Sequence, residues 1–138
     1  MKELSIEEKK LLFEDLSARL PYGVYVEHIT TEIRGKLKGM IFEHIYNDTD
    51  SIQDINAWVK FFGDEYVDAT YFRPILRPMS SMTEEEKKEY NELVSKLGDK
   101  EPYFVLEQMI VDFYHKRHLD NRLLIEKGLA IEAPEGMY

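Results

Sequence analysis

Apolar side chains near the start of the chain recur at the three- and four-residue spacing of a helix face. This pattern predicts a helix over residues 6–19, and Ser5 and Glu8 have the spacing of a capping box at its start. Pro21 follows the last apolar position and disfavours helical geometry in the residue before it, so the helix should end there. The apolar positions are Leu12, Phe13, Leu16 and Leu20.

Two further helices are predicted in the C-terminal half of the chain. Thr83 and Glu86 form a second capping box, and Gly98 supplies the left-handed residue that commonly ends a helix. The next helix should run from Pro102 to about His118, with a broad apolar face. The apolar positions of the two helices are Tyr90, Leu93, Val94 and Leu97, then Leu106, Met109, Ile110, Phe113 and Tyr114.

Between the first helix and these two, β-branched and aromatic residues replace the helical pattern, which is typical of strands. Gly39 is a candidate for a β-bulge. Dense turn formers at 47–51 predict an exposed loop. The predicted strands are 22–29, 36–46 and 66–72.

Two stretches of the same region are harder to assign. Residues 52–62 alternate apolar and polar side chains, which favours a strand, and a short helix starting at Ser51 is the alternative. Residues 73–78 read Arg-Pro-Ile-Leu-Arg-Pro and cannot be helical throughout, because each proline pushes its predecessor into extended geometry. We expect a stiff connector here, leading from the sheet to the C-terminal half.

These elements predict an α+β fold. It has an N-terminal helix, a small and mostly antiparallel sheet of three or four strands, two C-terminal helices and a packed C-terminal tail. The 138 residues suit a single domain over residues 1–138, and a composition of 43% hydrophobic and 33% charged side chains is globular. Because the chain has no cysteine, disulfides and thiolate chemistry are excluded.

The net charge of the chain limits the classes of partner that it is expected to bind. The chain has 18 basic and 27 acidic side chains and a net charge of −9, which opposes direct binding to nucleic acid or to an anionic membrane. Its acidic start and its lack of a long apolar run argue against a signal peptide or a membrane span, so we expect a cytoplasmic protein. Acidic mimicry of nucleic acid, which needs carboxylates gathered on one face, is an alternative.

The densest group of reactive side chains lies near the end of the third predicted helix. His115 and His118 are three residues apart, so a helix would place them on one side, and Asp112 adds a carboxylate. Two imidazoles and a carboxylate can bind a divalent metal, which makes a small metal-dependent enzyme an alternative. No His-Glu-x-x-His spacing or obvious third ligand supports it, and histidines also favour the negative end of a helix dipole. We therefore expect no cofactor.

Arginines next to prolines form the one concentrated basic spot of this acidic chain. Arg73 and Arg77 belong to it, and Arg77 has the chemistry to contact a carboxylate or another anion. The alternative is that both arginines pair with the chain's own acids. We take Arg73, Arg77, Asp120 and Arg122 as candidate interaction residues, and we predict no catalytic residue.

Three segments together resemble a family of small proteins from gut-bacterial prophages and related mobile elements. They are Arg19–Val24, Leu76–Glu86 (Leu-Arg-Pro-Met-Ser-Ser-Met-Thr-Glu-Glu-Glu) and Leu124–Tyr138, which closes with Gly-Leu-Ala-Ile-Glu-Ala-Pro-Glu-Gly-Met-Tyr. The resemblance implies a bacterial cytoplasm and a phage or mobile-element context, and it carries no catalytic role. The chain departs from the family pattern at Met79, where leucine is typical, and at Asp120–Leu123, where Asp-Tyr-Arg-Gly is typical.

The leading functional hypothesis is a non-enzymatic accessory module of a prophage or mobile element that binds an unidentified protein partner. It follows from the lack of a catalytic constellation in the sequence together with the resemblance. Nothing in the sequence identifies that partner or the oligomeric state.

The last ten residues are too apolar for an unattached terminus. We expect residues 129–138 to pack on the domain through Leu129, Ile131, Met137 and Tyr138. Deleting 129–138 should then lower the melting temperature in a thermal denaturation experiment. An unchanged melting temperature would instead make the tail a free ligand for a partner.

Overall fold

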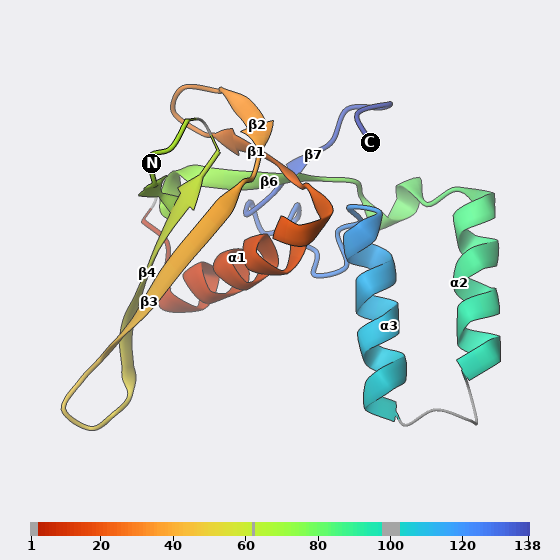
Figure 1. The fold of residues 1–138 in the computed structure, drawn as a ribbon, viewed down its shortest axis with the longest axis horizontal. Coiled ribbons are helices and arrows are strands. Elements are labelled where there is room, and N and C mark those ends of the chain that lie inside the picture. The colour runs from red at the N-terminus through yellow and green to blue at the C-terminus, as the bar shows by residue number, and fades with distance from the viewer. Residues whose placement is uncertain (1–2, 62, 98–102) are drawn as a thin grey trace.

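The chain up to residue 76 forms a helix and most of two small sheets, and the remainder adds a pair of helices and a returning tail that supplies one further strand (Figure 1). The computed structural model describes residues 3–61, 63–97 and 103–138. The α+β fold predicted from the sequence is confirmed. The helices are α1 (Ile6–Arg19), α2 (Glu84–Leu97) and α3 (Tyr103–Lys116), and the strands are β1 (Tyr25–His28), β2 (Arg34–Lys36), β3 (Gly39–Tyr46), β4 (Ile52–Lys60), β5 (Val67–Asp68), β6 (Phe72–Leu76) and β7 (Ile131–Glu132).

Helix α1 has the predicted bounds because its signals are local. The Ser5 hydroxyl accepts a hydrogen bond from the backbone N–H of Glu8 (3.1 Å), and the Glu8 carboxylate accepts one from the N–H of Ser5 (3.0 Å). Its apolar face is buried in the main core, as predicted. A short 3₁₀ turn over Leu20–Tyr22 follows it and ends at Gly23, whose φ of +68° suits a residue without a side chain.

The strands form two sheets, where the sequence predicted one. The first sheet has the order β2-β1-β6-β7, with β7 parallel to β6, and the second is the antiparallel sheet β3-β4-β5. The predicted strand over 36–46 is interrupted at Leu37 and Lys38. The N–H of Leu37 donates to Val24 beside the first sheet, while that of Lys38 donates to Lys60 in the second. These consecutive residues bond to different sheets, so the chain crosses from one to the other here.

Residues 52–60 form a strand, not the short helix that was the alternative interpretation. Ile55, Ala57 and Val59 in β4 are buried beneath α1, and the residues between them are less so. Gly39 begins β3 opposite Lys60, and the irregularity in the pairing of β3 with β4 lies between Ile45 and Tyr46.

The predicted connector over 73–78 is largely a buried strand. Phe72–Leu76 is β6, whose residues are all buried between β1 and β7. Pro74 has no N–H to donate, and it is tolerated because β7 meets β6 only at Ile75 and Leu76. The strand predicted over 66–72 is shorter than expected, because the Asp68 carboxylate accepts from Thr70 and starts a 3₁₀ turn.

Helices α2 and α3 pack side by side through aromatic rings, with Tyr90 contacting Phe113 and Tyr114 at ring-centroid distances of 5.6 and 5.9 Å. The capping box of Thr83 and Glu86 is present. Helix α3 ends at Lys116, before the predicted end at His118. The predicted boundaries at Gly98 and Pro102 lie outside the described residues.

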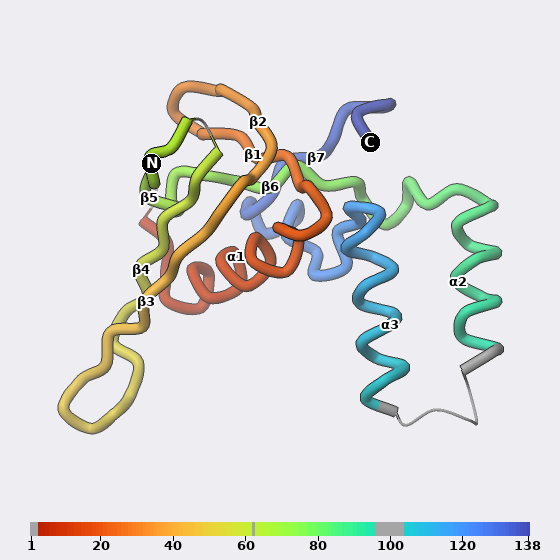
Figure 2. Tube along the Cα trace, viewed as in Figure 1, coloured from red at the N-terminus to blue at the C-terminus, as the bar shows by residue number. Residues whose placement is uncertain are grey.

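The C-terminal tail packs on the first sheet, as predicted. Leu129 is buried, β7 pairs with β6, and the N–H of Ala133 donates to the carbonyl of Leu76 (2.7 Å). The Tyr138 hydroxyl donates to the carbonyl of Ile75 (2.6 Å) and accepts from the N–H of Tyr25 (3.0 Å). Figure 2 shows the tail returning past β6, with the α2–α3 pair and the β3–β4 hairpin extending on opposite sides of the molecule.

Candidate interaction surface

The Arg77 side chain makes its polar contacts with other residues of the same chain. Its guanidinium donates two hydrogen bonds to the Glu86 carboxylate (2.9 and 2.6 Å) and one to the carbonyl of Ser81 (3.1 Å). The contact with Arg77 lowers the pKa of Glu86 to about 2. Arg77 therefore pairs with one of the chain's own acids and holds the start of α2 against β6.

Asp120 lies beside the backbone of Arg77. The N–H of Arg77 donates to the carbonyl of His118, and the N–H of Asp120 donates to the carbonyl of Arg77, both at 2.8 Å. The Asp120 carboxylate is 3% exposed and accepts from the backbone N–H groups of Leu124 (2.8 Å) and Ile125 (2.9 Å). Its role is to shape the chain reversal after α3, so it is not available to a partner.

The remaining two candidate residues are also engaged. Arg122 donates to the Asp15 carboxylate at 2.7 Å. Arg73 lies apart from this group, is 7% exposed and donates to the carbonyls of Thr70 and Phe72. Burial lowers the pKa of Arg73. The structure thus gathers Arg77, Asp120 and Arg122 around one internal junction, which joins parts of the fold and presents little free charge.

The centre of that junction is an ion pair that the sequence analysis missed. Asp15 and Arg19 are both 0% exposed, and the Arg19 Nε donates to the Asp15 carboxylate at 2.9 Å. The Arg19 Nη2 donates to the carbonyl of Leu119 (2.7 Å) and to the carboxamide of Asn121 (2.9 Å). An i, i+4 pair of opposite charges within the apolar stretch of a helix was the available signal.

His115 and His118 do not share a helix face. His115 is 3% exposed in α3 with its Nε2 3.4 Å from the Arg122 Nη1, while His118 follows the helix at a φ of +58° and stacks on Tyr138 with ring centroids 3.8 Å apart. Burial, helped by nearby arginines that include Arg19, lowers the pKa of each histidine to about 4. In the described part of the chain, no three His, Asp or Glu side chains are placed to hold a metal ion.

The Asp112 carboxylate accepts a hydrogen bond from the Gln108 carboxamide at 3.0 Å. That contact uses a carboxylate oxygen within α3 itself. Cationic neighbours of His115 also oppose a divalent ion, because like charges repel strongly in a partly buried site. Asp15 and Asp112 lie near His115 as well, but the described residues bring no set of three metal ligands together there.

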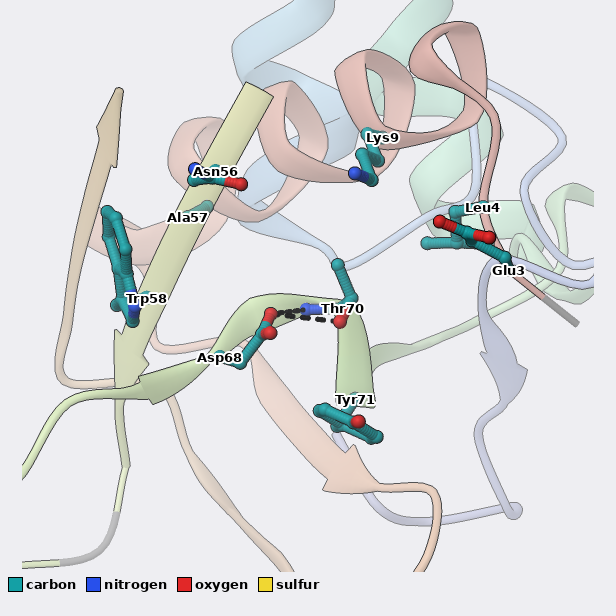
Figure 3. A pocket seen from close by; sticks show the side chains of 9 residues that line it. All are labelled: Glu3, Leu4, Lys9, Asn56, Ala57, Trp58, Asp68, Thr70 and Tyr71. Carbon is teal, nitrogen blue, oxygen red and sulfur yellow. Dashed lines mark hydrogen bonds between the residues drawn. The ribbon is translucent and has the colours of Figure 1, made fainter. Parts of the chain in front are cut away.

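A cavity of about 350 Å³ opens at the edge of β4 where β5 ends (Figure 3). Lys9, which extends from α1, is paired with Asp54 at 2.8 Å, and the Asp68 carboxylate accepts from the N–H and hydroxyl of Thr70. These charged groups are therefore occupied by neighbours. The lining residues are Glu3, Leu4, Lys9, Asn56, Ala57, Trp58, Asp68, Thr70 and Tyr71.

The surface that differs most from this well-paired interior is the β3–β4 hairpin, residues 39–60, here called the hairpin arm (Figures 1 and 2). Its tip is ordered by Asn47, whose side-chain oxygen accepts from the N–H groups of Thr49 (2.9 Å) and Ser51 (3.1 Å). In the part of the chain that the structure describes, β3 has a neighbouring strand only on its β4 side.

Helix α1 covers one strand of the arm and leaves most of the other open. Phe42 lies opposite the buried Ala57, and His44 lies opposite the buried Ile55, so these pairs share one face of the sheet. Yet Phe42 is 42% exposed and His44 is also exposed. The cover that buries β4 therefore does not extend over Phe42 and His44, although Met40 near the start of β3 packs against the core.

Exposed apolar side chains line both faces of β3. On the face that α1 covers at β4 but not here, the rings of Phe42, His44 and Tyr46 follow one another, with centroids 5.9 and 6.3 Å apart. Tyr46 is 57% exposed, and on the opposite face Ile41 is 51% exposed beside Trp58. Contiguous apolar side chains on an edge strand are typical of protein-binding surfaces.

The hairpin arm is also rich in acidic side chains, and its one basic residue, Lys60, lies at its end. From Gly39 to Val59 the chain has no lysine or arginine. Of its acidic side chains, Asp54 alone has a salt bridge within the described residues, to Lys9. The carboxylates of this stretch are Glu43, Asp48, Asp50 and Asp54. This gap in basic residues was visible in the sequence, although the exposure of β3 was not.

No protein-family model, curated protein sequence or solved structure matches this chain. Its function must therefore be inferred from its own residues. The helices within residues 3–61, 63–97 and 103–138 all lack the length and apolar character needed to cross a membrane.

Replacing Asp15 with asparagine should destabilise the fold strongly. The substitution leaves the buried Arg19 guanidinium without its counter-ion, so we expect the free energy of unfolding in urea to fall by roughly 3–5 kcal/mol. Asp54→Asn is the matched control, because its side chain is 40% exposed. Loss of that surface pair with Lys9 should cost less than about 1 kcal/mol. Similar, small losses in both variants would contradict a structural role for the buried pair.

Stability should fall as the pH falls from about 6.5 to about 4. The folded chain holds His115 and His118 neutral, with pKa values of about 4, whereas unfolded histidine titrates near 6.5, so the unfolded state binds more protons in this window. Each histidine contributes a slope of up to about 1.4 kcal/mol per pH unit. Urea denaturation at several pH values between about 7 and 5 measures this slope. These values lie above the pH range in which protonation of Glu86 would break its ion pair with Arg77.

His115→Gln should flatten that dependence, because glutamine does not titrate. His118→Gln removes the other histidine of lowered pKa and should flatten the slope by a similar amount. A wild-type stability that does not vary between about pH 7 and 5 would contradict the burial of neutral histidines at the junction.

Proposed function

We propose that this chain is a non-enzymatic protein-interaction module of a prophage or mobile element, and that it binds its partner through the hairpin arm. The observation that carries the proposal is the open edge of β3 with apolar side chains exposed on both of its faces. The prophage context comes from the resemblance of the sequence segments described above.

An edge strand directs half of its backbone N–H and C=O groups away from its neighbour, and these groups can pair with another chain. Proteins usually protect such edges with lysine, proline or an irregularity in the strand. β3 contains neither lysine nor proline, and the irregularity in its pairing comes only at Ile45 and Tyr46, beside the tip. An edge that is this long and this unprotected is suited to binding.

The contacts of the interior polar side chains favour a binding protein over an enzyme. Arg77, Asp120 and Arg122 are engaged in internal contacts, and the buried His115 and half-buried His118 lie at the same junction as neutral side chains. The residues whose chemistry first suggested a site therefore maintain the fold. The exposed side chains of the hairpin arm make no comparable set of contacts.

Photo-crosslinking from the hairpin arm tests the proposal. A benzophenone amino acid replaces Phe42 in one variant and the exposed Glu92 of α2 in a control. Each is irradiated in bacterial lysate with and without phage proteins. We expect a discrete adduct from position 42 that excess unlabelled wild-type protein abolishes and that excess Ile41→Lys protein does not. The control position should give no such adduct.

The same crosslinking experiment can also contradict binding through the hairpin arm. A competed adduct from position 92 with none from position 42 would place the binding surface elsewhere. Equal competition by wild-type and Ile41→Lys protein would show that β3 does not contribute. Unchanged circular dichroism and melting temperature of each variant, expected because the replaced side chains are exposed, show that the fold is intact.

A further inference from the structure

We infer that the hairpin arm takes a basic, extended polypeptide segment, which adds to the open edge of β3 as a further strand. This inference rests on the proposed function and adds the chemistry of the partner. Three features of the hairpin arm support it: the strand edge, the charge and the exposed rings.

The strand edge determines the conformation of the partner. A segment that pairs with β3 must itself be extended, because only then do its N–H and C=O groups alternate at the spacing of the edge. It lies about 4.8 Å from β3, so its side chains alternate between the two faces of the sheet. One set of partner side chains then lies near Phe42 and His44, and the other near Ile41 and Glu43.

The negative charge of the hairpin arm determines the sign of the charge that its partner should have. Glu43 belongs to β3, while Asp48 and Asp50 lie in the exposed loop at its end, and all three are exposed. Lys9 is paired with Asp54 further along β4, so it does not neutralise these groups. A segment with lysine or arginine supplies the missing positive charge. Such complementarity acts mainly on selectivity and the rate of association, while the strand pairing supplies affinity.

The exposed rings favour the same partner. Phe42 is 42% exposed and Tyr46 is 57% exposed on β3, the strand that forms the open edge. Aromatic faces attract cationic side chains, most often arginine, whose planar group stacks on a ring. The apolar stems of arginine and lysine can in addition cover the exposed aromatic carbon.

A second copy of this chain is the main competing occupant, and charge argues against it. Pairing of β3 with its own copy would bring two hairpin arms together, each with Glu43, Asp48 and Asp50 and with no lysine or arginine from Gly39 to Val59. Like charges placed opposite each other on paired strands are destabilising. A basic segment from another protein avoids this repulsion.

Three short synthetic peptides test the inference on the full chain. One alternates arginine with valine and threonine, the second has glutamate in place of arginine, and the third is the arginine peptide with prolines at its centre. Fluorescence anisotropy measures affinity, and amide chemical shifts in NMR spectra locate the contact. We expect the arginine peptide to bind at least about tenfold more tightly than the other two. Its shifts should fall on residues 39–46, and its affinity should decrease with added salt.

A charge-matched pair of variants checks where the selectivity arises. Asp48→Lys with Asp50→Lys should remove most of the preference for the arginine peptide. Glu85→Lys with Glu92→Lys makes the same change in net charge at exposed positions of α2 and should leave the preference in place. An equal loss in both double variants would overturn a specific role for the hairpin arm, because net charge alone would then explain the preference.

The other outcomes also decide the question. Equal binding of the arginine and glutamate peptides at β3 overturns the basic partner and leaves the proposed function intact. Binding with shifts outside β3, or no binding by any peptide, overturns the inference. A concentration-dependent dimer in sedimentation experiments that Ile41→Lys disrupts replaces the basic segment with a second copy. The proposed function fails separately, through the crosslinking at position 42, because that experiment assumes no partner charge.

Discussion

Arg19 is fully buried at the end of α1, where its side chain links this helix to the segment that follows α3. Its guanidinium reaches the carbonyl of Leu119 and the carboxamide of Asn121, which follow α3, while Asp15 supplies its counter-ion one helical turn earlier. A guanidinium loses its hydration in such a place, so it is stable only with partners in good geometry. The position of α1 against the C-terminal segment depends on this side chain.

Other links converge on the same place. The backbone of Arg77 bonds to His118 and Asp120, and the Asp120 carboxylate holds the turn that directs the chain toward β7. Tyr138 then closes the first sheet by bonding to both β6 and β1. Because contacts of this kind occupy the side chains of Arg77, Asp120 and Arg122, the junction is a structural element.

The hairpin arm has the opposite character. The buried side chains of β4 pack beneath α1. By contrast, β3 exposes apolar side chains and acidic groups to solvent. An exposed edge strand carries a risk of unwanted pairing, and the local negative charge limits pairing with like-charged copies. The same two properties, an open edge and a net negative charge, give a surface selective for an oppositely charged strand. Binding through the hairpin arm is thus compatible with an interior devoted to stability.

Residues 5–19 show what the sequence by itself determined. The capping box and the apolar spacing of α1 involve neighbours along the chain, so they were readable before any tertiary contact was known, and the same holds for the cap of α2. The tail was also predictable, because its apolar side chains needed cover. Local signals therefore determined the α+β class, both ends of α1 and the start of α2.

Tertiary structure alone decided the rest. The proline-rich segment around Pro74 became a buried strand because β1 and β7 meet it from distant parts of the chain, and the strand after Gly39 split from the first sheet because Leu37 and Lys38 found different partners. Arg77 and Arg122 turned inward because Glu86 and Asp15 lie within reach only in the folded chain. The exposure of β3 likewise depends on how far α1 extends across the sheet. Pairing partners and burial are set by contacts between residues far apart in sequence, which local patterns do not encode.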